Sequence, residues 1–315
     1  MSLQITDLEK IIHYHFPAAS GRIHLSPITT GKFNNSYWVQ AGETELVLRI
    51  APPDDAVFVF YERKMMRQEP ALHALLREKT SVPVAEIVVF DDSQTGIDRD
   101  YMLMMRLAGR PLTETPHVSQ SHVLRQVGEY LAQVHGLRAR QYGYLGAHQP
   151  MLPQNNWADA FIIMWHKMID DIVGVGHYNE IESSHLRRLL DQYLFLFDRP
   201  VTSRLLHMDI WHQNILVDDS GTVTGVVDWD RALWGDPEIE FAVLDYCGIS
   251  KPAFWEGYGQ PREWTPEAQV RQVFYLLYEL QKYIVIRHGR SRDPAAARRY
   301  KQQVWKIVRD LENNN

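Results

Sequence analysis

Hydrophobic and polar residues alternate in short runs over the first hundred positions of the chain, which is the pattern of half-buried β-strands. Glycine-containing and polar segments separate several runs and indicate turns between them. Apolar residues at helical spacing predict a short helix at Asp7–His15 and a longer one at about Phe58–Arg77, which Pro83 ends. The strands are predicted to form a small antiparallel sheet and to lie at Ile23–Ile28, Ser36–Gln40, Glu45–Ile50, Glu86–Phe90 and Tyr101–Met105.

The pattern becomes mainly helical after Gly109. The exception is Ser203–Val227, which is typical of short strands around two loops. The chain is therefore predicted to be an α+β protein with two lobes, residues 1–108 and 109–315, joined by a connector near Arg106–Gly109. Helices are expected at Ser119–Gly136, Trp157–Gly174, Ile181–Phe197, Glu238–Cys247, Pro266–His288 and Ala295–Glu312.

Composition narrows the class of protein. The chain has 315 residues, 45% of them hydrophobic and 23% charged, as in an ordinary globular protein. A net charge of -6 argues against a general nucleic-acid binder, which usually has a basic face. Cys247 is the only cysteine, so neither an intramolecular disulfide nor a CxxC metal site can form. The sequence has neither a signal-peptide pattern nor a long apolar run, so we expect a cytoplasmic protein without a membrane or nucleic-acid partner.

The strongest chemical signal is the segment LLHMDIWHQNILVDDSGTVTGVVDWD. It contains His207-x-Asp209-x-x-x-x-Asn214, a turn at Asp218–Gly221 and a strand that ends at Asp228. A hairpin would bring two carboxylates and one amide to a common point. Phosphoryl transfer needs such a set, because it uses an acceptor for the hydroxyl proton and hard oxygen ligands for Mg²⁺. We interpret Asp209 as the catalytic base and Asn214 and Asp228 as metal ligands. The alternative is a polar loop in which the two aspartates form a turn and a helix cap.

These motifs resemble those of the aminoglycoside phosphotransferase and choline kinase family, whose members are distant relatives of protein kinases. In that family H-x-D-x-x-x-x-N is followed by D-x-D or D-x-E, and Asp228-Trp229-Asp230 fits. Gly235-Asp236-Pro237, followed by the acidic Glu240, fits as well. The resemblance covers about residues 20 to 250. It implies a protein-kinase-like fold, a nucleotide-binding N-lobe, a C-lobe that carries the catalytic loop and the acceptor site, and ATP and Mg²⁺ as cofactors, with GTP as the alternative nucleotide.

The resemblance also implies a phosphate-binding pair in the N-lobe. Arg49 lies where protein kinases have the lysine that binds the α- and β-phosphates, and a guanidinium can bind phosphate in a bidentate way. Glu69 is its expected helix partner, with Glu62 as the alternative. The simpler interpretations are an arginine on an exposed strand face and a solvated glutamate.

Two further segments match nucleotide-binding parts of the family. Gly31 and Asn34 lie in the segment that resembles the nucleotide-positioning loop, although a plain hairpin turn explains them nearly as well. Met105 and Leu107 lie in the expected hinge, where backbone groups would hydrogen-bond adenine. Met104 would lie behind the base, or would simply be part of a buried strand.

The resemblance implies transfer of the ATP γ-phosphate to a hydroxyl group of a small molecule. The short gap from Asp228 to the helix near Glu238 favours a small acceptor over a peptide. An aminoglycoside-type antibiotic is the first candidate; choline or ethanolamine, a fructosamine and a homoserine-like metabolite are the alternatives. A nucleotide-binding pseudokinase is the alternative of another class, but such proteins typically lose the base or a metal ligand.

Acidic and aromatic residues of the C-lobe favour a cationic acceptor, because carboxylates attract ammonium groups and aromatic faces bind them. The walls of the acceptor site are expected from the helices around Trp157–Val173 and from Asp245–Trp264. Asp170 and Glu256 are examples of the carboxylates expected there.

Overall fold

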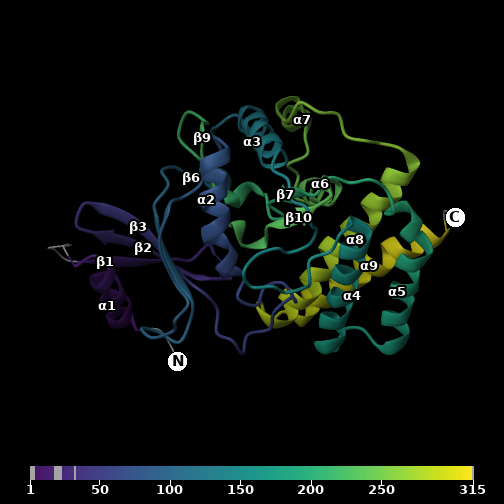
Figure 1. Cartoon of the computed structure of the whole chain (residues 1–315), viewed down its shortest axis with the longest axis horizontal. Helices are drawn as coiled ribbons and strands as arrows, with labels where there is room; N and C mark the ends of the chain where they lie inside the picture. Colours follow the sequence, from purple (N-terminus) through teal and green to yellow (C-terminus); the bar gives the residue numbers. More distant parts are fainter. Residues whose placement is uncertain (1–3, 18–22, 32, 314–315) are drawn as a thin grey trace.

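The computed structural model describes residues 4–17, 23–31 and 33–313. Its N-terminal lobe, the N-lobe, contains an antiparallel sheet of order β1-β2-β3-β5-β4 (Figure 1). Each strand lies within two residues of its predicted bounds at either end. The sequence alternation was therefore a correct guide to the sheet. The strands are β1 (His24–Ile28), β2 (Asn35–Ala41), β3 (Thr44–Ile50), β4 (Ile87–Asp91) and β5 (Tyr101–Met105).

Two helices pack on this sheet. The predicted first helix is confirmed as α1 (Ile5–His15), which buries Leu8 and Ile12 in one hydrophobic cluster with the sheet. The second was predicted to begin too early. Residues 58 and 59 have no regular structure, residues 60–64 form turns, a short 3₁₀ helix η1 (Met65–Gln68) follows, and only then does α2 (Glu69–Lys79) begin.

Tertiary contacts explain why residues 58–64 are not helical. The Glu62 carboxylate accepts a hydrogen bond from the Val59 N–H at 3.0 Å, and the Asp171 carboxylate, far along the chain, accepts one from the Phe60 N–H at 2.6 Å. Lys64 has a left-handed backbone with φ 59°, which breaks a right-handed helix. These side-chain acceptors compete with helical carbonyl groups for the backbone N–H groups. Sequence periodicity does not report such long-range contacts.

The C-terminal lobe, the C-lobe, is mainly helical, and its six predicted helices are confirmed. One short helix, α7, was missed because seven residues are too few for a periodic signal. It packs against α3 so closely that a Cβ on Gly128 or Gly257 would overlap the facing backbone. The described helices are α3 (Gln120–Val134), α4 (Trp157–Gly174), α5 (Glu180–Tyr193), α6 (Pro237–Tyr246), α7 (Pro252–Tyr258), α8 (Pro266–Gly289) and α9 (Pro294–Asn313).

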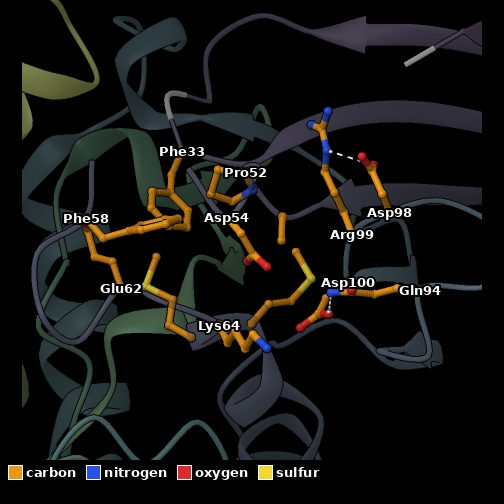
Figure 2. A pocket seen from close by; sticks show the side chains of 13 residues that line it. Phe33, Pro52, Asp54, Phe58, Glu62, Lys64, Gln94, Asp98, Arg99 and Asp100 are labelled. Carbon is orange, nitrogen blue, oxygen red and sulfur yellow. Dashed lines mark hydrogen bonds and ion pairs between the residues drawn. The ribbon is translucent and has the colours of Figure 1, made fainter. Parts of the chain in front are cut away.

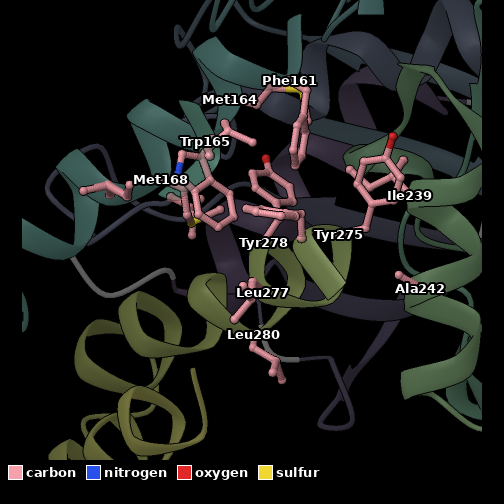
Figure 3. Packing of buried hydrophobic residues seen from close by; sticks show 14 of the residues in the cluster. Phe161, Met164, Trp165, Met168, Ile239, Ala242, Tyr275, Leu277, Tyr278 and Leu280 are labelled. Carbon is pink, nitrogen blue, oxygen red and sulfur yellow. The ribbon is translucent and has the colours of Figure 1, made fainter. Parts of the chain in front are cut away.

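Aromatic side chains fill the core between α4 and α8 (Figure 3). Phe161 packs edge-on against Tyr275 with ring centroids 5.1 Å apart, and Trp165 and Tyr278 are buried in the same cluster. Burying aromatic rings of this size contributes a large part of core stability. The core fixes α8, whose C-terminal half faces the interlobe cleft.

Short strands between the helices hold the loops that carry the predicted chemistry. The sheet of order β6-β8-β9 contains β6 (Arg110–Pro111), β8 (Ile215–Val217) and β9 (Val223–Val226), and β7 (Arg204–Leu206) pairs with β10 (Leu233–Gly235). Antiparallel pairing puts Ile215 opposite Val226. The residue before β8 and the residues after β9 therefore lie side by side. Four 3₁₀ turns complete this part of the fold: η2 (Leu112–Glu114), η3 (Leu194–Leu196), η4 (His212–Asn214) and η5 (Trp229–Arg231).

None of the helices within the described ranges is long and apolar enough to cross a membrane.

Candidate active site

A cleft of about 900 Å³ lies between the two lobes. Its lining comes from N-lobe strands, the connector, the loops on either side of the β8–β9 hairpin, and the C-terminal helices. A separate cavity between the sheet and residues 52–66 measures about 20 Å³ (Figure 2). That volume holds only one or two water molecules, so we consider the large cleft as the candidate site.

The loop between β7 and β8 brings two predicted site residues together. The Asn214 amide donates a hydrogen bond to the Asp209 carbonyl oxygen at 2.9 Å and lies 3.5 Å from the Asp209 carboxylate. With its Nδ2 used in this way, Asn214 keeps its Oδ1 as an acceptor. Both residues line the cleft. The amide thus fixes the loop that presents Asp209.

Arg231 is the immediate counter-ion of Asp209. Its guanidinium lies 3.0 Å from Asp209 Oδ1 and also pairs with the buried Glu62 at 3.5 Å. Burial on its own would raise the pKa of Asp209, but the positive charges around it, with Arg231 first and Lys282, His207 and Arg290 after it, together outweigh burial and lower the pKa. Asp209 is therefore ionised at neutral pH and can accept a hydrogen bond from a hydroxyl group.

Glu240 supports the loop that carries Asp209 from its buried side. Its carboxylate, which is fully buried, accepts hydrogen bonds from the backbone N–H groups of His207 and Met208 at 2.9 and 2.7 Å. Met208 has a left-handed backbone with φ 66°, a conformation that a methionine adopts only when its surroundings impose it. The His207 ring lies 3.0 Å from the Val227 carbonyl oxygen and so links the loop to the end of β9.

Asp228 follows β9 and faces Asp209 across the hairpin. It has a left-handed backbone with φ 63°, and its half-exposed carboxylate pairs with Arg49 at 3.1 Å through Oδ1. Desolvation by the surrounding protein and the charge of Glu69 raise the pKa of Asp228, although Arg49 acts in the opposite direction. Burial and the charge of Glu69 raise the pKa of Asp230 to about 8. The carboxylates repel one another here, so a cation would be attracted.

The donor set fits Mg²⁺. Asn214 Oδ1 and the second oxygen of Asp228 are hard ligands on one side of the cleft. Within the described part of the chain, no group of three or more His, Cys, Asp or Glu side chains could hold a metal ion by itself. A cation at this point would therefore need further oxygen ligands from a bound molecule, which is the usual situation for Mg²⁺ beside phosphates.

Arg49 and Glu69 form a buried ion pair, with Arg49 Nη1 2.6 Å from Glu69 Oε2. Nη2 of the same guanidinium reaches Asp228 and Asp230, both at 3.1 Å. The alternative partner, Glu62, instead binds Arg231 and Arg290. The strand β3, the helix α2 and the loop after β9 are thus joined through one arginine. Its role towards phosphate stays a prediction.

The remaining predicted nucleotide contacts also line the cleft. Asn34 donates a long hydrogen bond of 3.4 Å to Asp230, and Gly31 lies beside it in the lining. In the connector, the Met105 N–H is already bonded to the Glu86 carbonyl at 2.8 Å, so it cannot bind a base. The Leu107 N–H has no partner among the described residues and lies at the cleft.

The far end of the cleft is formed by side chains of α6, α8 and α9, which we call the C-lobe wall. Its members are Tyr246, Tyr283, Arg287, Arg290 and Tyr300. Only Tyr246 lies in a stretch that was expected to line the acceptor site, Asp245–Trp264; the other four residues were not predicted from the sequence. The helix spacing of 283, 287 and 290 was a usable signal, but periodicity alone does not say which helix face lines a cleft.

The expected acidic walls are not found. Asp170 is paired with Arg187 at 2.6 Å, Glu256 forms an ion pair with Arg125, and neither lines the cleft. No residue of Trp157–Val173 lines it either; those side chains pack in the core or face away. Of Asp245–Trp264, only Tyr246 and Cys247 are part of the lining.

Comparisons with known proteins agree with this architecture. The sequence profile described as phosphotransferase enzyme family matches residues 24–271. Hygromycin-B 4-O-kinase from Escherichia coli is 27% identical over 254 residues, which is 76% of this chain and 66% of that protein. A protein named "Probable ketoamine kinase" from Lactiplantibacillus plantarum is 25% identical over 282 residues, 87% of this chain and 92% of the relative.

Solved structures show the same fold. Aminoglycoside phosphotransferase APH(4)-Ia superposes with a TM-score of 0.66 at 21% identity, covering 96% of this chain and 99% of that one. A thermostable mutant of that enzyme, solved with AMP-PNP and hygromycin B, has a TM-score of 0.65 at 20% identity over 96% and 99% of the two chains. These neighbours have the bilobal, protein-kinase-like arrangement of the present chain.

Proposed function

Because the chain belongs to the phosphotransferase enzyme family of small-molecule kinases, we propose that it transfers the γ-phosphate of ATP to a hydroxyl group of a small molecule. The observation that carries this proposal is the arrangement of Asp209, Asn214 and Asp228 around one end of the β8–β9 hairpin, in the cleft between the lobes. This is the set of groups that phosphoryl transfer requires.

Asp209 acts as the base in this proposal. Its Oδ1 is held by Arg231, which leaves Oδ2 for the attacking hydroxyl. The lowered pKa keeps Asp209 ionised. In a loose phosphoryl-transfer transition state little proton transfer is needed early, so an ionised carboxylate that orients the hydroxyl is sufficient.

The nucleotide phosphates would lie between β3 and the loop after β9. Arg49 would bind phosphate oxygens from the N-lobe side, held in place by Glu69. Asn214 and Asp228 would hold Mg²⁺, which neutralises phosphate charge when bound. Adenine would lie against the connector, where the Leu107 N–H is the available donor. A GTP preference would have to arise at the same backbone groups.

The acceptor candidates are an aminoglycoside-type antibiotic and a sugar–amine adduct such as a ketoamine. The names of the relatives support both, and the tyrosines of the C-lobe wall suit the faces of sugar rings. Choline, ethanolamine and homoserine-like metabolites stay as alternatives. The positive charge expected of the acceptor has no support from Asp170 and Glu256, because both lie outside the cleft.

An ADP-release assay tests this function. The purified protein, with ATP and Mg²⁺, is screened against aminoglycosides, ketoamines, choline and homoserine, and products are checked by mass spectrometry for one added phosphoryl group. We expect acceptor-dependent ADP release that the Asp209→Asn variant loses. Tight Mg²⁺–ATP binding with no transfer to any acceptor would instead favour the pseudokinase alternative.

A further inference from the structure

The C-lobe wall is one continuous surface built by three helices. Tyr283, Arg287 and Arg290 follow one face of α8 at i, i+4 and i+7, so their side chains are neighbours. Tyr300 of α9 stacks on Tyr283 with ring centroids 4.9 Å apart, and its hydroxyl lies 3.1 Å from that of Tyr246. Burial raises the pKa of Tyr283, and the charges of Glu279 and then Asp209 raise it further, so the wall lies within electrostatic reach of the predicted base.

The arginines of this region differ in what they bind. Arg231 pairs with Asp209 and Glu62, and Arg290 pairs with Glu62 at 2.6 Å and lies over the Phe33 ring. Arg287 has no ion pair with any residue that the structure describes. Among the described residues, its guanidinium makes one weak contact, a 3.5 Å approach to the Ser291 hydroxyl, and its Nε is buried without a partner.

A half-buried guanidinium without a counter-ion is an unusual feature of a cleft wall. Leaving a charged donor without a partner costs free energy, so a ligand that supplies an acceptor recovers that cost on binding. The guanidinium also offers a planar pair of donors that matches a carboxylate or phosphate. Arg287 can therefore form an ion pair with a ligand that carries a carboxylate or a phosphate.

The wall is poorly suited to a cationic ligand. Described carboxylates in the cleft lining are Asp209, Asp228 and Asp230, which belong to the transfer site, and Glu114, on the turn that follows β6. The tyrosine faces are partly used: Tyr283 stacks on Tyr300, and the Lys282 ammonium lies 5.1 Å from the Tyr283 ring centroid. An aromatic cage for an ammonium group needs open faces and no neighbouring cations.

We propose that the acceptor carries an anionic group, a carboxylate or a phosphate, which Arg287 binds while the tyrosines of the C-lobe wall contact its hydroxylated body. Among the candidates above, this favours a sugar–amine adduct that carries an acidic group over an aminoglycoside-type antibiotic. This proposal rests on the proposed function, since it assigns the far end of the same cleft to the acceptor. It makes Arg287 the residue that gives the protein its preference for acceptors of one charge.

The test uses four probes with one hexose skeleton: glucuronate, glucose 6-phosphate, glucose and glucosamine. Their dissociation constants are measured by calorimetry on protein saturated with AMP-PNP and Mg²⁺, so that nucleotide sites are filled. ADP release is measured in parallel with ATP. We expect at least one anionic probe to bind about tenfold or more tightly than glucose and glucosamine, as a charge-assisted hydrogen bond allows. The two anionic probes distinguish a carboxylate from a phosphate.

Variants assign that preference to Arg287. Arg287→Gln should abolish most of the preference for the anionic probe, and Arg287→Lys, which keeps the charge, should restore part of it. Arg309→Gln, the same change on the exposed side of α9, is the matched control and should keep the preference. Thermal unfolding of each variant separates a loss of selectivity from a loss of folding.

The other outcomes overturn either the anion proposal or the proposed function. Equal or tighter binding of glucose or glucosamine, or no measurable preference among the probes, excludes an anion-binding role. If Arg287→Gln raises the KM for ATP by the same factor with every acceptor, the guanidinium serves the nucleotide instead. Acceptor-dependent ADP release with amines would leave the kinase function standing while the anion proposal fails, and charge selectivity in binding without phosphoryl transfer to the full acceptor panel would do the opposite.

Discussion

The two ends of the cleft are built on different principles. At the proposed transfer site, formed by Asp209, Asn214 and Asp228, two arginines contact several carboxylates. Arg49 contacts three carboxylates and Arg231 contacts two, and most of these carboxylates lie on short loops. At the C-lobe wall, tyrosines and arginines come from three long helices, and Arg287 has no described counter-ion.

In our proposal, the paired charges serve the phosphoryl transfer that any acceptor undergoes, whereas the C-lobe wall serves the recognition of one class of acceptor. Paired charges hold a fixed arrangement at the transfer site, so they need little reorganisation during the reaction. An unpaired guanidinium on a helix has no counter-ion to position in the free protein, and in our proposal it distinguishes ligands by their charge. Substitutions in the C-lobe wall could therefore change the acceptor while the residues of the proposed transfer site stay the same.

The largest effect is expected at the predicted base. Asp209→Asn should lower kcat by about two or more orders of magnitude, the scale of general-base catalysis, with little change in ATP affinity. The matched control is Asp219→Asn, because Asp219 lies on the exposed turn between β8 and β9. Near-full turnover of Asp209→Asn would show that Asp209 is not the base. The contrast between a transfer end and a recognition end of the cleft would then lose its basis.

Asp228→Asn tests whether the transfer site also holds the metal. We expect the Mg²⁺-dependent affinity for AMP-PNP to fall about tenfold or more, because one charged ligand is lost. Binding of AMP-PNP in the presence of a chelator should change much less. If titrations with Mg²⁺ give the same dependence in the variant and the parent protein, Asp228 is not a metal ligand and only pairs with Arg49.

Arg231→Gln tests whether the charge of Arg231 controls the ionisation of Asp209. Arg231 lowers the pKa of Asp209, so removing its charge should raise that pKa. Asp209 must be ionised to accept the proton, and the acidic limb of kcat/KM should therefore move to higher pH. Arg231→Lys, which keeps the charge, should move it less. An unchanged acidic limb with lower kcat would mean that Arg231 only positions the loop.

The smallest effect concerns Asp171, a carboxylate on α4 that, like Arg287, has no ion pair in the described ranges. Burial raises the pKa of Asp171 to about 7, well above its ordinary value of 3.8. The folded protein therefore binds this proton more tightly than the unfolded chain, and the free energy of unfolding decreases as pH rises from about 4 to 7.

Asp171→Asn removes that penalty and keeps an acceptor for the Phe60 N–H. We expect the variant to be more stable than the parent by about 1 kcal/mol at pH 8 and not at pH 4, with the gain limited because the group is only partly buried. Urea unfolding at both pH values measures this. The exposed neighbour Asp170, paired with Arg187, is the control as Asp170→Asn. Equal changes at both pH values would show that ionisation of Asp171 is not the cause.

Much of the fold and of the transfer site followed from the sequence alone. Alternation and helical spacing are local, so β1 to β5 and the long C-lobe helices lay close to their predicted positions. Asn214 and Asp228 flank the β8–β9 hairpin, so local strand pairing brings them together, and Asp209 is joined to Asn214 by a hydrogen bond within the preceding loop. The Arg49–Glu69 pair was expected from a resemblance to a family, and the structure brings the two side chains together.

Only the tertiary structure decided the rest. Residues 58–64 had helical periodicity, but Asp171, more than a hundred positions away, takes the Phe60 N–H and holds a turn. The carboxylates expected at the acceptor end, Asp170 and Glu256, are paired elsewhere on the surface. The C-lobe wall joins Tyr246, Tyr283 and Tyr300 from three helices, and their meeting depends on how α6, α8 and α9 cross. Periodicity identifies which residues share one helix face, whereas the packing of helices against one another determines what that face meets.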